Sequence, residues 1–149
     1  MNLEDLPRVG IAGIIFSPES KILLGKRIDN KNPHGNGVWQ FPGGHLKRNE
    51  DYCDGVLREI KEETGLSEGI QLVKNSPVES TNDISKISGT HYVTLFFEAR
   101  YSGTEAPSVM ESDKCESWRW YDWKDIESMK SELFLPIQNL IDLGYRPFR

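Results

Sequence analysis

Three acidic residues stand close together in the middle of the chain and are the clearest candidates for chemistry. Glu59 lies three residues before Glu62 and four before Glu63, so on a helix the three carboxylates project from one side. Like charges at that spacing destabilise a helix by roughly 0.2 to 0.5 kcal/mol per pair. Mg²⁺ would offset the repulsion, because it takes carboxylate oxygens and keeps other positions for water and substrate phosphates. The pattern predicts a magnesium site, and a solvated acidic face is the alternative.

The segment that carries these acids has the signals of a capped amphipathic helix. A glycine-rich loop precedes it, Asn49 or Asp51 can supply the N-cap oxygen, and Gly65 is placed to end the helix. Apolar residues recur at spacings of three and four, so we expect one face to pack on a core. These residues are Cys53, Val56, Leu57, Ile60 and Thr64.

The spacing across residues 44–66 resembles the signature box of the Nudix hydrolases. Fixed glycine, glutamate, arginine and aliphatic positions define that box, and this chain fills all of them. They are Gly44, Glu50, Arg58, Glu59, Ile60, Glu62, Glu63, Gly65 and Leu66. The resemblance implies an α/β fold, the Nudix α/β/α sandwich with a curved mixed sheet between helices, formed by residues 1–149 as a single domain. It also implies hydrolysis of a diphosphate that is linked to another group.

The resemblance assigns roles to the box residues. Glu59 and Glu63 are the expected main metal ligands, and Glu62 is expected to bind the metal or to orient a water. The backbone carbonyl of Gly43 is the expected ligand from the loop. Mg²⁺ is the expected cofactor, with Mn²⁺ as a substitute.

Two further parts of the expected catalytic apparatus lie beside these ligands. Arg58 and Glu50 are expected to form an ion pair that orients the box carboxylates, and a phosphate contact of Arg58 is the alternative. The family usually recruits one more acid from outside the box. Glu116 is our choice for this metal ligand or base and Glu111 is the second choice, while either residue could be an ordinary surface acid.

The resemblance extends beyond the box to a MutT-like nucleotide-sanitising branch of the family. That branch includes a human enzyme that hydrolyses thiopurine nucleotides and plant enzymes that hydrolyse geranyl diphosphate. The similar segments are Leu23-Leu24-Gly25-Lys26-Arg27, Pro42-Gly43-Gly44-His45-Leu46, His91-Tyr92-Val93-Thr94, Lys114-Cys115-Glu116-Ser117-Trp118 and Gly144-Tyr145-Arg146-Pro147-Phe148.

This wider resemblance implies five substrate contacts. Arg27 is expected to contact a phosphate, although a solvent-exposed arginine at a strand end is the alternative. Leu133 and Phe134 are expected to border a base or prenyl pocket, since aromatic faces stack on bases for about 1 to 3 kcal/mol; plain core packing is the alternative. Thr94 is expected to line the same pocket, with an ordinary cross-strand neighbour as the alternative, and His45, beside the glycine loop, is expected to touch substrate.

Composition limits which binding partners and which cellular locations are compatible with the sequence. The net charge of −5 argues against a nucleic-acid polymer, because phosphate tracking needs a basic surface. The apolar run of residues 9–16 is too short to cross a membrane and lacks the features of a signal peptide. We therefore expect a small-molecule nucleotide as partner, no membrane association and a cytoplasmic location. The branch resemblance suggests a homodimer.

The rest of the chain predicts a sandwich of mixed strands and two helices. Residues 79–89 and 102–114 are predicted to be loops, and residues 132–143 a second amphipathic helix despite Pro136. The predicted strands are residues 9–16, 21–27, 38–41, 70–73, 91–101 and 116–121.

Three functions fit these observations. The first is a Mg²⁺-dependent Nudix hydrolase that cleaves a nucleoside triphosphate, including a modified or oxidised purine, to the monophosphate and pyrophosphate. The second keeps this chemistry on an isoprenyl diphosphate or a nucleoside diphosphate-sugar. The third is a non-catalytic nucleotide-binding sensor, which the retained glutamates of the box disfavour.

Overall fold

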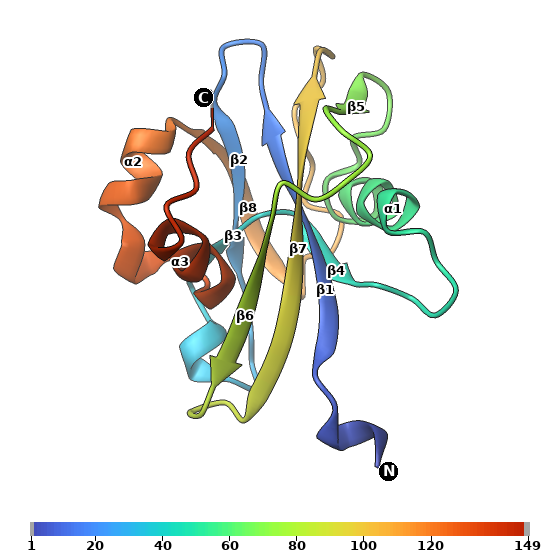
Figure 1. The fold of residues 1–149 in the computed structure, drawn as a ribbon. Helices are drawn as coiled ribbons and strands as arrows, with labels where there is room; N and C mark the ends of the chain where they lie inside the picture. Colours follow the sequence, from blue (N-terminus) through green and yellow to red (C-terminus); the bar gives the residue numbers. More distant parts are fainter. Residues whose placement is uncertain (1, 148–149) are drawn as a thin grey trace.

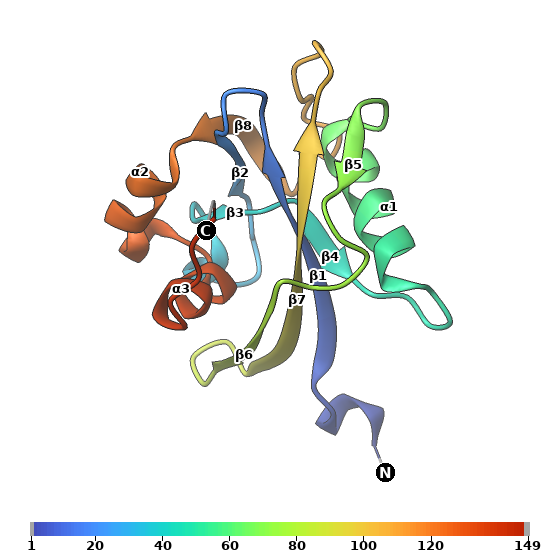
Figure 2. The ribbon, with the colours of Figure 1, turned by 45° about the horizontal axis from the view of Figure 1, so that its top comes forward.

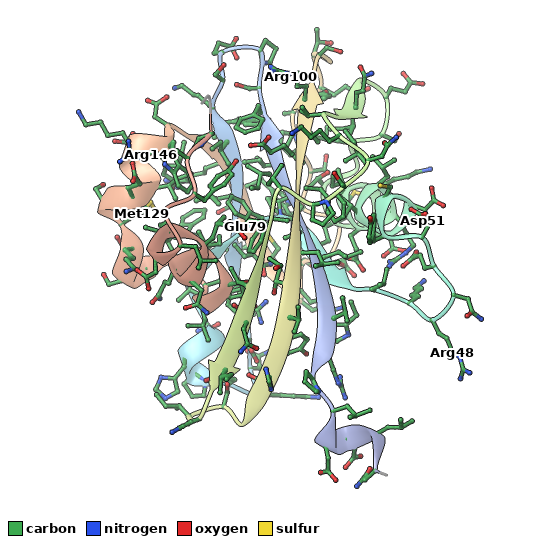
Figure 3. All side chains as sticks on the ribbon, in the orientation of Figure 1. Arg48, Asp51, Glu79, Arg100, Met129 and Arg146 are labelled. Carbon is green, nitrogen blue, oxygen red and sulfur yellow. The ribbon has the colours of Figure 1, made fainter. Side chains whose placement is uncertain are left out.

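The computed structural model describes residues 2–147. Its central feature is a β-sheet that has helices on both faces (Figure 1). Helix α1 covers one face, and α2 and α3 cover the other; the view turned by 45° keeps this arrangement (Figure 2). Asp51 lies at the start of α1, and Met129 and Arg146 lie on the α2–α3 side (Figure 3). The predicted α/β sandwich is confirmed. Phe148, part of the C-terminal resemblance, lies outside the described residues.

Within residues 2–147 the sheet has eight strands. The strands are β1 (Arg8–Phe16), β2 (Ile22–Arg27), β3 (Trp39–Gln40), β4 (Gly43–His45), β5 (Ile70–Leu72), β6 (Glu79–Ser85), β7 (Thr90–Tyr101) and β8 (Cys115–Tyr121). The helices are α1 (Tyr52–Thr64), α2 (Trp123–Ser128) and α3 (Leu135–Asp142), with short 3₁₀ turns at Leu3–Asp5, Pro33–Gly35 and Lys130–Glu132.

Strands β1 and β7 form the centre of the sheet. They run parallel from the pair Arg8 and Tyr92 to the pair Phe16 and Arg100. The other edge of β1 pairs antiparallel with β4 along its first half and with β2 at its end. In the same way β7 pairs first with β6 and then with β5. Each central strand therefore changes its antiparallel partner along its length, and the resulting sheet is mixed.

Two apolar cores lie on opposite faces of the sheet, and β1 contributes to both. Ile11 and Ile15 pack with Ile60 of α1, whereas Ile14 packs with Ile137 of α3. Side chains of a strand alternate between its two faces, and a central strand covered on both faces is apolar throughout. This explains the continuous apolar run that the sequence shows. Among the described residues, no helix is both long and apolar enough to span a lipid bilayer.

Helix α1 begins and ends where the sequence predicts. Asp51 is the N-cap, and its Oδ1 accepts a 2.9 Å hydrogen bond from the backbone N–H of Cys53. Asn49, the other candidate, adopts a positive φ in the preceding turn instead. Gly65 ends the helix with φ of 76°, in the left-handed region that glycine adopts without steric cost. The capped helix therefore holds the box carboxylates on a fixed scaffold.

The prediction of a polar loop over residues 79–89 was wrong. Seven of these residues form β6, which pairs with β7. Thr81 and Asp83 point into the protein although both are polar, and Thr81 Oγ1 donates a 3.1 Å hydrogen bond to Asp83. A strand whose buried side chains bond to one another does not show the apolar alternation that sequence patterns detect.

Other boundaries also differ from the prediction. The second long helix begins at Leu135 rather than at residue 132, since Pro136 occupies its first turn, where a missing N–H costs nothing. Helix α2 was not predicted. Leu57 of α1, expected on the apolar face, is 38% exposed. Strand β8, predicted from residue 116, begins one residue earlier, at the buried Cys115.

Candidate active site

The glycine-rich segment before α1 is a strand, β4, lodged between β1 and the helix. A Cβ on Gly43 would lie 2.2 Å from the backbone oxygen of Ile11, and a Cβ on Gly44 would lie 2.5 Å from Oε1 of Glu59. At Gly43 the clash would be with the backbone of β1, so this position requires glycine; at Gly44 a side chain would displace the Glu59 carboxylate. The segment that the sequence predicted to be a loop is therefore part of the sheet. The carboxylates of Glu59 and Glu63 on α1 lie against its backbone.

Arg58 connects four parts of the site. Its Nε and Nη2 donate to the two carboxylate oxygens of Glu50 at 2.7 and 3.0 Å, and Nη1 donates to Glu59 at 2.8 Å and to Glu62 at 3.1 Å. Nη2 also donates to the backbone oxygen of His45 at 3.2 Å. The structure therefore contains the expected Arg58–Glu50 ion pair, and the arginine contacts both of the carboxylates that it was expected to orient.

These contacts shift the pKa values of the paired groups. The hydrogen bonds from Arg58, with one from the backbone N–H of Lys47, lower the pKa of Glu50 to about 2. The hydrogen bond to Glu50, followed by that to Glu59, raises the pKa of Arg58 further above its usual value. Both groups are thus charged throughout the range in which proteins are folded.

Glu63 is held differently from the other acids. Its Oε2 accepts a 2.7 Å hydrogen bond from the backbone N–H of Gly43. Burial raises its pKa to about 8, with the Glu59 and Glu111 carboxylates adding to the rise and the Gly43 hydrogen bond opposing it. The charge of Lys114 opposes the rise as well, but it contributes less than burial and the two carboxylates, so the positive charge near Glu63 is insufficient. A divalent cation would supply that charge and favour the ionised form.

The residues present fit a magnesium ion. Glu59 lies against Gly44, and Glu63 against Gly43, so two hard oxygen donors share one stretch of backbone. Within residues 2–147 no three acidic, histidine or cysteine side chains are already grouped as a metal site. Mg²⁺ is commonly held by one or two carboxylates, with water and substrate phosphates as its other ligands, so two donors suffice. Glu62 extends toward Arg58 at the solvent side.

The structure separates the two candidates for an acid outside the box. Glu116 is largely exposed and lies 3.8 Å from Lys26. Glu111 is less exposed, lies 3.5 Å from Lys114, and its charge contributes to the raised pKa of Glu63. Glu111, the second choice from the sequence, is therefore the acid whose charge acts on Glu63.

A cavity of about 440 Å³ opens beside the glycine strand. All five residues predicted to contact substrate line it, together with two of the box region. They are Arg27, His45, Thr94, Leu133 and Phe134, with Gly43 and Gly44. The structure thus brings together residues from β2, β4, β7 and the segment before α3. The cavity and the box carboxylates meet at β4.

Arg27 forms part of the cavity wall. Its guanidinium donates to the backbone oxygen of Gly35 at 3.1 Å, to Gln40 at 2.8 Å and to Asp29 at 3.3 Å. The same group lies 4.1 Å from the centre of the Phe134 ring. These contacts fix the arginine and the aromatic ring in place. Arg27 is therefore not a solvent-exposed arginine at a strand end, which was the alternative to a substrate contact. Its contact with phosphate stays a prediction.

Leu133 and Phe134 differ in burial. Leu133 is 1% exposed and belongs to the core on the α3 side, which agrees with the alternative of core packing. It also lines the cavity. The backbone N–H of Phe134 donates a 2.8 Å hydrogen bond to the oxygen of Trp39. The ring of Phe134 is therefore presented at the cavity by a backbone that is tied to β3.

His45 is stacked on Tyr92 at the mouth of the site. The ring centres lie 5.4 Å apart with 20° between the planes, and His45 Nε2 lies 2.9 Å from the hydroxyl of Tyr92. Burial, followed by the charge of Arg8, lowers the pKa of His45. Sequence reasoning missed Tyr92. It also missed Asp83 of β6, which lines the same cavity; every residue of β6 except Ile84 is polar, so the sequence carries no alternation that could have revealed it.

The fold and the site together define an α/β sandwich in which a glutamate-bearing helix packs on a glycine strand. A NUDIX domain model matches residues 6–140, and the chain belongs to the Nudix hydrolase family. It is a hydrolase of phosphoanhydride bonds.

Relatives and solved structures agree with this assignment. The chain is 29% identical to an RNA pyrophosphohydrolase of Gluconacetobacter diazotrophicus over 79% of each chain. It is 32% identical to an RNA pyrophosphohydrolase of Cereibacter sphaeroides over 76% of this chain and 74% of the relative. A MutT NUDIX hydrolase structure from Burkholderia pseudomallei superposes with a TM-score of 0.68 at 28% identity, covering 94% of this chain and 98% of the other.

Proposed function

We propose that the protein is a Mg²⁺-dependent pyrophosphohydrolase that cleaves a nucleoside triphosphate, including a modified or oxidised purine, to the monophosphate and pyrophosphate. The observation that carries this proposal is the junction at β4. On one side Glu59 and Glu63 lie against Gly43 and Gly44, and on the other side the same glycines line a cavity with Phe134. A nucleoside in the cavity would therefore extend its phosphates toward the carboxylates.

Each residue of the site has a physical task in this proposal. Glu59 and Glu63 would hold the ion, and Arg58 fixes the orientation of Glu59 through its 2.8 Å hydrogen bond. When bound, Mg²⁺ neutralises charge on the phosphate oxygens and lowers the pKa of a bound water. Phe134 offers an aromatic face for the base. Glu111, or Glu116 as the sequence alone favoured, would accept a proton from the attacking water.

Removal of pyrophosphate from the 5′ end of an RNA is a second candidate. It is favoured by the names of the two relatives reported above, which are both RNA pyrophosphohydrolases, at 29% and 32% identity. The chemistry at the phosphates is the same for a free nucleotide and a triphosphorylated RNA end. The net charge of −5 weighs against extended contact with an RNA backbone. The small nucleotide is therefore our first proposal.

Steady-state rates distinguish the two substrates. We expect kcat/KM for at least one nucleoside triphosphate to exceed that for a 5′-triphosphorylated oligonucleotide of the same first base, with no turnover in excess chelator. A higher value for the oligonucleotide would establish the RNA function instead. The panel should include geranyl diphosphate and a nucleoside diphosphate-sugar. Tight nucleotide binding without any product in excess Mg²⁺ would indicate the sensor.

The remaining parts of the proposal concern the molecule as a whole. We propose that residues 1–149 act as one Nudix unit, that Mn²⁺ can replace Mg²⁺, and that the protein is a cytoplasmic homodimer. The match of the family model to residues 6–140 supports the single unit. Light scattering coupled to size-exclusion chromatography measures the oligomeric state, and a monomer mass would refute the dimer.

A further inference from the structure

Asp83 is a buried carboxylate in the wall of the cavity. Asp83 is 3% exposed, and it belongs to the part of β6 that faces the cavity. Oδ2 accepts hydrogen bonds from Thr94 at 2.5 Å and from Thr81 at 3.1 Å, and Oδ1 accepts one from the side-chain amide of Asn139 at 2.9 Å. Three elements, β6, β7 and α3, therefore hold this carboxylate in one orientation.

The surroundings of Asp83 are unusual for a buried acid. Buried aspartates are normally paired with a cation or a metal, but among residues 2–147 no lysine, arginine or histidine forms an ion pair with Asp83. Its three partners in that range are neutral donors. An ionised carboxylate has about four acceptor positions, so this group can accept one more hydrogen bond. Hydrogen bonds to a charged acceptor are the strong ones.

The cavity gives a ligand access to that carboxylate. On the same face of the sheet, β1 contributes Gly10 and Ala12, and Gly10 is opposite Thr94 in the strand register. Because Gly10 and Ala12 have small or no side chains, they leave space in the cavity next to the Asp83 carboxylate. Phe134 also lines the cavity, so an aromatic ring and a charged acceptor are available to one planar ligand.

We propose that Asp83 selects the base of the substrate by accepting a hydrogen bond from a lactam N–H, the ring –CO–NH– group of guanine, hypoxanthine and the pterins. This inference rests on the proposed nucleotide function, which it narrows to 6-oxopurine nucleotides. Adenine presents a ring nitrogen lone pair where guanine presents this N–H, and a lone pair facing a buried carboxylate is repelled. A site built around one hydrogen bond rejects an analogue that lacks it.

Equilibrium binding in chelator tests the inference without any turnover. By calorimetry we expect GMP and IMP to bind the wild-type protein about 10- to 100-fold more tightly than AMP, and 1-methyl-GMP, whose lactam N–H is blocked, to bind as weakly as AMP. Neopterin and UMP also carry a lactam N–H but are not purines: binding of either one more tightly than GMP would overturn the assignment to 6-oxopurines. Equal affinity for GMP and 1-methyl-GMP would overturn the inference.

The Asp83→Asn variant adds a second test. An amide of the same shape keeps the volume but removes the charge, so we expect the ratio of GMP to AMP affinity to fall at least about tenfold. Asp142→Asn is the matched control, because Asp142 is an exposed carboxylate of α3 paired with Lys130, and its ratio should not change. A retained ratio in Asp83→Asn would refute the role. The wild-type comparison with 1-methyl-GMP stands even where the variant does not fold.

The outcomes for base selection and for hydrolysis are separate. Hydrolysis of all nucleoside triphosphates at similar kcat/KM, with equal binding of GMP and AMP, would leave the proposed function intact and remove the role of Asp83. Selective GMP binding without hydrolysis of any triphosphate in Mg²⁺ would support the role of Asp83 and refute the proposed hydrolysis.

Discussion

The Glu63 carboxylate accepts a 2.7 Å hydrogen bond from the backbone N–H of Gly43, and this contact ties the last turn of α1 to the glycine strand β4. The missing side chain of Gly43 lets β4 lie against the backbone of Ile11 in β1, and that of Gly44 leaves room for the Glu59 carboxylate of α1. Burial nevertheless raises the pKa of Glu63 to about 8, so the carboxylate is placed for a cation at a cost to the metal-free fold.

Exchange of Glu63 for Gln should stabilise the metal-free protein at alkaline pH. A carboxyl whose folded-state pKa is raised contributes stability below its unfolded value of 4.5, and that stability is lost as pH rises to about 8. At pH 8.5 in chelator we expect Glu63→Gln to melt about 3 °C or more above wild type, with little difference at pH 4.5. Calorimetry of both proteins measures this.

The same variant should lose activity, because an amide is a poor ligand for Mg²⁺. We expect kcat to fall by about 10² or more, while Glu68→Gln, an exposed acid just after the helix, stays near wild type. A Glu63→Gln protein with wild-type kcat would remove Glu63 from the metal site.

Replacement of Arg58 should weaken metal binding through the acids that it holds. Arg58→Ala releases Glu50, Glu59 and Glu62 at once, and loss of such an orienting partner costs about 10- to 100-fold in metal affinity or activity. Arg58→Lys should recover only part of this, since one ammonium cannot replace the forked guanidinium. Titration with Mn²⁺ measures the affinity, and Lys61→Ala, an exposed cation of the same helix, is the control. Unchanged Mn²⁺ affinity would contradict the orienting role.

The Glu50 carboxyl should make the protein sensitive to acid. Its folded-state pKa is lowered from 4.5 to about 2 by the hydrogen bonds from Arg58 and from the backbone of Lys47. The resulting stability is present above pH 4.5 and is lost as pH falls toward 2. Glu50→Gln should therefore show a smaller decrease in melting temperature between pH 5 and pH 3 than wild type. Equal decreases in the two proteins would show that the ion pair does not couple to folding.

Phe134 should contribute to substrate affinity more than to the chemical step. Loss of a stacking aromatic ring costs about 1 to 3 kcal/mol per base, so Phe134→Ala should raise KM by about tenfold or more with a smaller change in kcat. Leu143→Ala, which truncates an exposed apolar residue just after α3, is the control. A change confined to kcat would place the ring at the reacting phosphates instead.

A pair of variants identifies the acid outside the box. Because the charge of Glu111 acts on Glu63 whereas Glu116 faces Lys26 near solvent, Glu111→Gln should reduce kcat about tenfold or more and Glu116→Gln much less. The opposite order would restore the choice made from the sequence. Melting temperatures of both variants separate loss of chemistry from loss of fold.

The box helix was predictable because several local signals agreed. The glycine at position 65 and the buried Ile60 follow from spacing alone, and the cap was narrowed to Asn49 or Asp51, of which the structure uses Asp51. The pocket residues could be named only through the family resemblance, since Thr94 and Phe134 are far apart in sequence and meet through the sheet. No periodic pattern carries that information.

The failures have physical causes as well. Strand β6 was missed because Thr81 and Asp83 are buried through mutual hydrogen bonds and not through apolar contact. Strand β4 was missed because glycine has low strand propensity, and its pairing depends on the space that only glycine leaves beside Ile11. In both cases tertiary contacts determine the local structure.

The parallel pairing of β1 with β7 has a consequence for how the protein matures. Arg8 and Tyr92 are opposite each other although more than half of the chain separates them. Contacts between such distant segments form slowly, because a large loop must close first. The box helix can form early during synthesis, but the glycine strand docks on β1 and the cavity floor requires β7. Hydrolytic competence should therefore appear only after the last strands have emerged from the ribosome.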